Sequence, residues 1–137
     1  MAFNGTLIKL GSSTPLPYRF IKAESYKCYP DQRMEASAER VSTGKLHRQT
    51  CSHTATKIEF ETKSMWNTDM QAFTSLFDSN WTNAQERKIS VTYYDTWTNS
   101  HKTGEFYVPD MEMDILRVDS VNNRILYGPM RIALIEY

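Results

Sequence analysis

The sequence lacks an excess of either charge, because its 137 residues carry 16 Lys and Arg side chains against 16 Asp and Glu. General binding to nucleic acid or to an anionic membrane surface depends on excess positive charge, so this balance disfavours both functions. A small domain without net charge is also poorly protected against self-association. The composition therefore suits a subunit that packs against copies of itself.

Long apolar runs and an export signal are also missing. No stretch approaches the roughly 18 apolar residues of a membrane-spanning helix, and the N-terminus does not combine a basic start with an apolar run. We therefore expect no membrane association and no secretion. Cysteine is scarce, and Cys28 and Cys51 are expected to be free thiols because two cysteines without export do not make a disulfide framework.

Catalytic motifs are absent as well. The sequence contains no Gly-x-Ser-x-Gly element, no phosphate-binding loop and no dinucleotide fingerprint. Nucleophilic catalysis needs a nucleophile, a histidine and an orienting acid brought together, and no spacing here indicates such a set. We therefore predict that the protein is not an enzyme and needs no cofactor.

One cluster resembles a metal site in composition. His47, Cys51 and His53 lie close together, with Cys28 upstream, but the paired C-x₂₋₄-C element typical of zinc sites is missing. A surface loop that contains a semi-buried cysteine explains the same pattern, so we predict no metal site. A metal-dependent protein that uses these four residues is kept as an alternative.

What the sequence does contain is mostly a period-two pattern, in a length that fits one domain over residues 1–137. Expected strands cover residues 5–10, 18–28, 54–63, 88–95, 103–108, 113–118 and 124–136, the last broken at Gly128-Pro129. The pair Asn122-Asn123 is suited to a hairpin turn at positive φ. We predict a mainly β fold, a two-sheet β-sandwich or small barrel of about seven strands.

One segment, residues 68–79, has helical periodicity instead. Met70, Phe73, Leu76 and Phe77 fall on one helix face, and Thr68 followed by Gln71 fits a capping box. We expect this single helix to pack against the sheet.

The polar segment 29–52 has no clear apolar periodicity and is predicted to be a long loop. A loop this polar cannot offset its ordering entropy by burying its own surface, so we expect an outside partner to order it. Its cations Arg33, Arg40, Lys45 and Arg48 are candidate inter-subunit contacts, because such side chains, Arg above all, pair with carboxylates at interfaces.

The opposite charge gathers further along the chain, where Glu105, Asp110, Glu112 and Asp114 lie close in sequence. Asp110, Glu112 and Asp114 alternate, so an extended chain would place them on one face. Two interpretations have equal weight: these residues are partners for the basic segment, or they are scattered surface charge.

Aromatic residues suggest a different function. Tyr93, Tyr94 and Trp97 lie near Lys88 and Lys102, which invites comparison with base-stacking platforms in oligonucleotide-binding barrels. The alternative function is therefore a single-stranded nucleic-acid-binding β-barrel module.

The order of elements over the last two thirds of the chain resembles a family of small proteins encoded in the tail modules of siphophages and prophages. The residues that carry the resemblance are Glu39-Arg40-Val41 with Lys45 and Arg48, Ile58-Glu59-Phe60, the helix around 70–77, 91–95 (VTYYD), 103–110 (TGEFYVPD), 127–130 (YGPM) and 133–136 (ALIE). The same order is similar to the tail-tube fold.

That resemblance implies a structural subunit of a bacteriophage tail, as tube, terminator or baseplate component. It implies rings, typically hexamers, that stack with other tail proteins around a channel through which DNA passes without specific binding. The acidic residues Glu105, Asp110, Glu112 and Asp114 would then line that channel or contact the neighbouring subunit. The protein would be made in the bacterial host cytoplasm and end in the virion.

Overall fold

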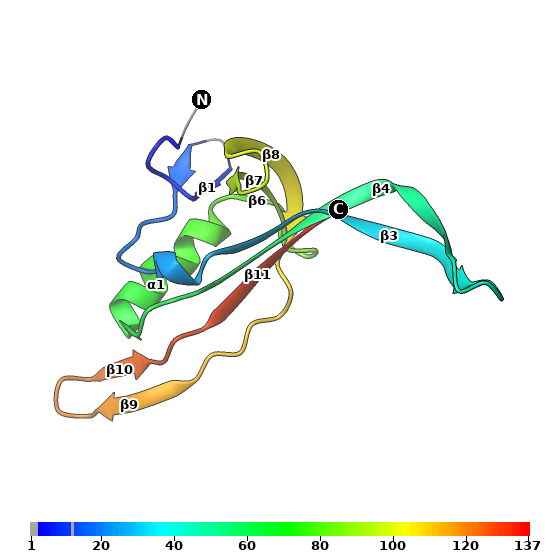
Figure 1. Ribbon diagram of the computed structural model, residues 1–137. Coiled ribbons are helices and arrows are strands. Elements are labelled where there is room, and N and C mark those ends of the chain that lie inside the picture. The colour runs from blue at the N-terminus through cyan, green and yellow to red at the C-terminus, as the bar shows by residue number, and fades with distance from the viewer. Residues whose placement is uncertain (1–2, 12) are drawn as a thin grey trace.

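A computed structural model describes residues 3–11 and 13–137, which form two antiparallel sheets and one α-helix (Figure 1). The strands are β1 (Ile8–Leu10), β2 (Thr14–Pro15), β3 (Lys27–Arg40), β4 (Leu46–Glu61), β5 (Met65–Trp66), β6 (Trp81–Asn83), β7 (Lys88–Asp95), β8 (Ser100–Tyr107), β9 (Ile115–Asp119), β10 (Arg124–Tyr127) and β11 (Arg131–Glu136). The helix is α1 (Asn67–Asp78), and a 3-10 turn, η1 (Ala23–Ser25), precedes β3.

The larger sheet has the order β2-β1-β7-β8-β11-β4-β3, and β6 pairs with β7 beside this path. The smaller sheet has the order β5-β10-β9. The chain passes from the smaller sheet to the larger one at the predicted break, Gly128-Pro129, between β10 and β11. Strand β11 is central, and Ile132, Ala133 and Leu134 are all buried, which explains its apolar character on both faces.

The core lies between one face of the larger sheet, helix α1 and the chain around Phe20. Leu134 of β11 faces Ile58 of β4 across the ladder, and both side chains are fully buried. The Phe73 ring of α1 lies 5.8 Å from the Phe20 ring and 5.3 Å from the Phe77 ring. The helix therefore anchors the N-terminal segment to the sheet.

Helix α1 matches its predicted range within one residue at each end. Its buried side chains are Met70, Phe73 and Phe77, as the periodicity predicts. The predicted capping box is wrong, because Trp66 occupies the N-cap position and no side chain caps the helix. The N-terminus of α1 is instead held by the pairing of β5 with β10, which places Trp66 opposite Leu126.

The predicted mainly β class with one packed helix is confirmed, and the sheets do not close into a barrel. The described residues contain eleven strands, more than the predicted seven. The strand predicted over 18–28 does not form over residues 18–26, and only its last two residues are in a strand, at the start of β3. Phe20 and Ile21 are adjacent and both buried, which a strand with one solvent face does not allow.

The predicted long loop over 29–52 is also wrong, because this segment belongs to a β-hairpin made of β3 and β4. Backbone pairing runs from Lys27 opposite Glu59 to Arg40 opposite Leu46. Beyond its first residues the hairpin leaves the body of the protein (Figure 1), and every residue from 32 to 53 is exposed. We call residues 32–53 the arm. The arm therefore has backbone pairing of its own, and its contact with an outside partner stays a prediction.

Candidate interaction surface

The four cations predicted to contact other subunits all lie on the arm. Arg33 and Arg40 belong to β3, Arg48 belongs to β4, and Lys45 lies in the turn between the strands. The Arg33 guanidinium donates to the Asp31 carbonyl at 2.9 Å, and that of Arg40 donates to the Gly44 carbonyl at 2.9 Å.

Only one of these cations has a carboxylate partner within the chain, because Arg48 pairs with Glu35 across the hairpin. The ion pairs of the described residues include none with Arg33, Arg40 or Lys45. The arm therefore presents three cations to solvent, free to meet carboxylates of another molecule.

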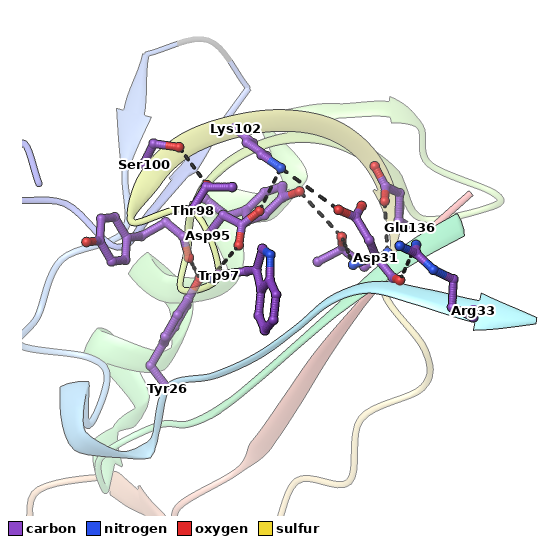
Figure 2. Close-up of polar contacts among 12 residues, drawn as sticks. Tyr26, Asp31, Arg33, Asp95, Trp97, Thr98, Ser100, Lys102 and Glu136 are labelled. Carbon is purple, nitrogen blue, oxygen red and sulfur yellow. Dashed lines mark hydrogen bonds and ion pairs between the residues drawn. The ribbon is translucent and has the colours of Figure 1, made fainter. Parts of the chain in front are cut away.

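The root of the arm is fixed by a polar network where β3 and β4 meet the β7–β8 hairpin. Figure 2 shows Lys102 between Asp95 and Asp31, with Nζ–Oδ2 distances of 2.9 and 3.9 Å. Asp95 is 1% exposed, and its Oδ1 also accepts the Trp97 backbone N–H at 2.8 Å. The network links Asp31, the residue just before the arm, to the tip of the β7–β8 hairpin.

The charge state of Asp95 follows from these contacts. Burial alone raises the pKa of this carboxyl, but hydrogen bonds from Lys102 and from the Trp97 N–H outweigh burial and hold the pKa below its ordinary value. The same hydrogen bond with Asp95 raises the pKa of Lys102. At neutral pH the pair is therefore a charged ion pair in a largely buried place.

A second set of bonds completes the root, and it involves the C-terminal strand. Thr56 is 1% exposed, its hydroxyl accepts the Asp31 N–H at 3.1 Å, and its own N–H donates to Glu136 at 2.8 Å. Asp31 has a φ of 47°, and the β3–β4 register shifts between Tyr29 and Gln32. This bulge bends β3 where the arm leaves the body.

The predicted acidic residues do not form one set. Glu105 lies on β8 and pairs with Lys88 at 3.2 Å. Asp110, Glu112 and Asp114 lie in the extended segment before β9 and line one hollow of about 310 Å³, beside the start of β11. Residues 108–114 lie outside the strands, so the single face that a strand would give these acids stays a prediction. One of them has a partner, since Arg87 lies 3.7 Å from Asp110.

The candidate metal ligands are not brought together. Among the described residues no group of three or more His, Cys, Asp and Glu side chains is arranged to hold a metal ion. His53 bonds the Tyr137 carbonyl at 2.8 Å, and both Cys28 and Cys51 are free thiols. Burial raises the pKa of the Cys28 thiol, which disfavours the reactive thiolate.

The aromatic residues of the alternative function do not form a stacking platform. Tyr93 is 3% exposed and packs edge-on against Phe106, at 5.4 Å between ring centroids. Trp97, by contrast, is 82% exposed at the β7–β8 turn. Strand alternation separates Tyr93 from Tyr94, so the three rings cannot stack on successive bases.

Sequence analysis missed Asp95, Lys102 and Thr56. A signal for Asp95 was present, because Ile89, Val91 and Tyr93 alternate as the buried face of β7 and Asp95 continues the same parity. A carboxylate at an inward position requires a charged partner, which here is Lys102. Thr56 likewise continues the buried parity of Ile58 and Phe60 on β4, but its partners Asp31, Tyr93 and Glu136 come from three separate segments.

The fold and the surface together define a mainly β domain with one helix and a projecting basic hairpin. A family model matches residues 1–137, so the chain belongs to the family of unknown function DUF6711. No curated protein matches the chain. Among the described residues, no helix combines the length and apolar character needed to cross a membrane.

Proposed function

We propose that this chain is a structural subunit of a bacteriophage tail that assembles into rings around a DNA-conducting channel. The arm of each subunit contacts a neighbouring copy. The observation that carries the proposal is the arm itself: 22 consecutive residues, 32–53, are all exposed although they form a regular hairpin. A hairpin that buries nothing within its own molecule contributes little to stability, which favours a role in contacts between molecules.

Two further features support assembly. Strand β3 is the edge of the larger sheet and β9 is the edge of the smaller one. Edge strands carry unpaired backbone groups that another chain can complete. Zero net charge also removes the general repulsion between copies.

The partners follow from the resemblance to tail-module proteins. They are copies of this chain in a ring, hexameric by analogy, and the other proteins of the tail. DNA passes through without specific binding, because a lumen that lacks cations offers no site for phosphate. The final location is the virion, after synthesis in the bacterial host cytoplasm.

Light scattering after size-exclusion chromatography, followed by negative-stain imaging, tests the assembly. We expect rings from the wild-type protein and monomers from the double variant Arg40→Glu/Lys45→Glu at the tip of the arm. The matched control is Arg19→Glu/Lys63→Glu, which reverses two exposed cations on the body and should leave the rings intact.

The location in the virion needs its own measurement. Mass spectrometry of particles purified from a bacterium that carries the gene should detect the chain in tails. A wild-type protein that stays monomeric at every soluble concentration, together with its absence from such particles, would refute the proposal.

A further inference from the structure

We propose that the groove between helix α1 and the segment 109–114 receives the arm tip of a second copy of this chain. The inference rests on the proposed ring assembly and names the surface that the arm contacts. It goes beyond a general attraction between basic and acidic regions, because it assigns an apolar pocket, an open backbone edge and an acidic hollow to one docking site.

The groove is apolar and large enough for side chains of a partner. Its volume is about 530 Å³, and it lies between α1, the β6–β7 turn and the segment before β9. Its apolar lining consists of Phe73, Phe77, Trp81, Ala84, Met111 and Met113, and Thr74, Asp78 and Arg87 complete the rim. Met113 is 43% exposed, so the groove opens to solvent. Aromatic and methionine side chains are typical of adaptable protein-docking pockets.

The floor of the site is an extended backbone without a partner. The Val108 N–H donates to the Arg87 carbonyl at 3.1 Å, and the Gly128 N–H donates to the Asp114 carbonyl at 2.9 Å. Between these two bonds, the described residues 109–113 make no backbone–backbone hydrogen bond. An extended segment in this state can pair with an incoming strand.

The two sides of this segment differ in chemistry. Met111 and Met113 line the groove, whereas Asp110, Glu112 and Asp114 line the hollow together with Arg131, a cation that already pairs with Glu59. A strand that paired with residues 109–113 would direct alternate side chains to the two sides. The site therefore selects a strand that carries an apolar residue next to a cation.

The tip of the arm carries that combination. Val41 follows Arg40, and Leu46 follows Lys45, so each strand end pairs a cation with a branched apolar residue. Val41 and Leu46 are 39% and 41% exposed and have no cover in the described part of the chain. Because neighbouring residues of a strand point to opposite sides, one can enter the groove while the other meets the acids.

The occupant is a second copy and not the chain's own arm. In Figure 1 the arm extends to one side of the molecule, and helix α1 lies on the opposite side of the body. The part of β3 that lies in the arm, residues 32–40, spans about 30 Å, enough to reach over much of a neighbouring domain of this size. Contacts between two different surfaces are head-to-tail, and they close into rings when the rotation allows.

Photo-crosslinking tests the contact directly. A photoreactive phenylalanine analogue replaces Leu46 in a mixture of isotopically light and heavy full-length chains, and the crosslinked peptides are identified by mass spectrometry. We expect light–heavy crosslinks from position 46 to residues 73–81 or 109–114. Crosslinks confined to other segments would overturn the proposal. That is also the expected result if a small apolar molecule, and not the arm, occupies the groove.

Two variants distinguish docking in the groove from nonspecific hydrophobic association. Met113→Asp should weaken ring formation by at least about tenfold, because it places a charge where an apolar anchor docks. Val121→Asp, in the turn between β9 and β10, is the control: this side chain is 88% exposed and outside the groove, so assembly should be unchanged. Both side chains are exposed, so both variants should fold.

The outcomes distinguish this inference from the proposed function. If the wild-type protein forms no assembly, the docking site is refuted, and the proposed function is refuted as well when the chain is also absent from purified tails. If it forms rings and Met113→Asp forms them equally well, the assembly stands and the groove is not the acceptor.

Discussion

At the scale of single residues, Asp95 is the side chain with the most demanding surroundings. A carboxylate that is 1% exposed must be neutralised or paired, because a lone buried charge is costly. Lys102 and the Trp97 N–H supply that pairing. The pair lies next to Asp31, so the residues that keep Asp95 charged also hold the root of the arm.

The variant Asp95→Asn should lower the free energy of unfolding at neutral pH by about 1–3 kcal/mol, because it removes the charge and leaves Lys102 without its buried partner. The folded-state pKa of Asp95 is lowered, so its contribution is complete above the unfolded value of about 3.9 and is lost as the pH falls through the folded value. The difference from wild type should therefore shrink in acid. Urea unfolding at about pH 7 and pH 2 measures it.

The exposed Glu24→Gln serves as the control for this series, and it should change stability by less than about 0.5 kcal/mol. A difference between wild type and Asp95→Asn that stays constant down to the acid limit would contradict the assigned role of the carboxylate charge.

At the scale of elements, the arm is a segment that has backbone pairing but no buried face. Strands β7 and β11 were predictable because apolar residues such as Ile89 and Leu134 mark a buried face. The distal halves of β3 and β4 bury neither face, so no periodic apolar signal exists to find. The two strands are held together by a ladder with shifts in register, and this pairing is visible only in the three-dimensional structure.

Removal of the arm should therefore leave the body folded. A variant in which residues 34–53 are replaced by Asn-Gly joins Arg33 to Thr54, which face each other across the ladder. The midpoint of thermal unfolding should move by no more than a few degrees, because every deleted residue is exposed. Circular dichroism measures the melting curve, and loss of cooperative unfolding would show that the arm is part of the core structure.

Light scattering on the same arm-deleted variant gives an independent readout. Assembly should be lost while folding is retained. Phe73→Ala, which removes a 1% exposed ring, is the opposite control and should destabilise the body strongly.

At the scale of the whole molecule, balanced charge conceals an uneven distribution. The chain has no net charge, yet Arg33, Arg40 and Lys45 project on the arm, while Asp110, Glu112 and Asp114 gather in a hollow of the body. Surfaces of opposite sign on one chain attract between copies, and added salt screens the attraction.

Assembly should accordingly weaken by several-fold between about 0.05 and 0.5 M NaCl, because the Debye length falls over this range. Analytical ultracentrifugation measures the association constant at each concentration. An association that strengthens with salt would indicate that apolar contacts dominate and that the charges contribute little.

The sequence alone was sufficient for the mainly β class, the position of α1 and the turn at Asn123, whose φ is 54°. Each depends on near neighbours in the chain, through hydrophobic period or local backbone preference.

Only the tertiary structure decided that the polar segment is a paired hairpin, that its root is held by Asp95, Lys102 and Thr56, and that a groove lies beside α1. These features join residues far apart in sequence, and even where parity marks an inward position such as Asp95, no single segment reveals its partner. The local sequence pattern indicates which side chains are buried. Backbone pairing and concave surfaces, by contrast, depend on which distant segments lie next to one another.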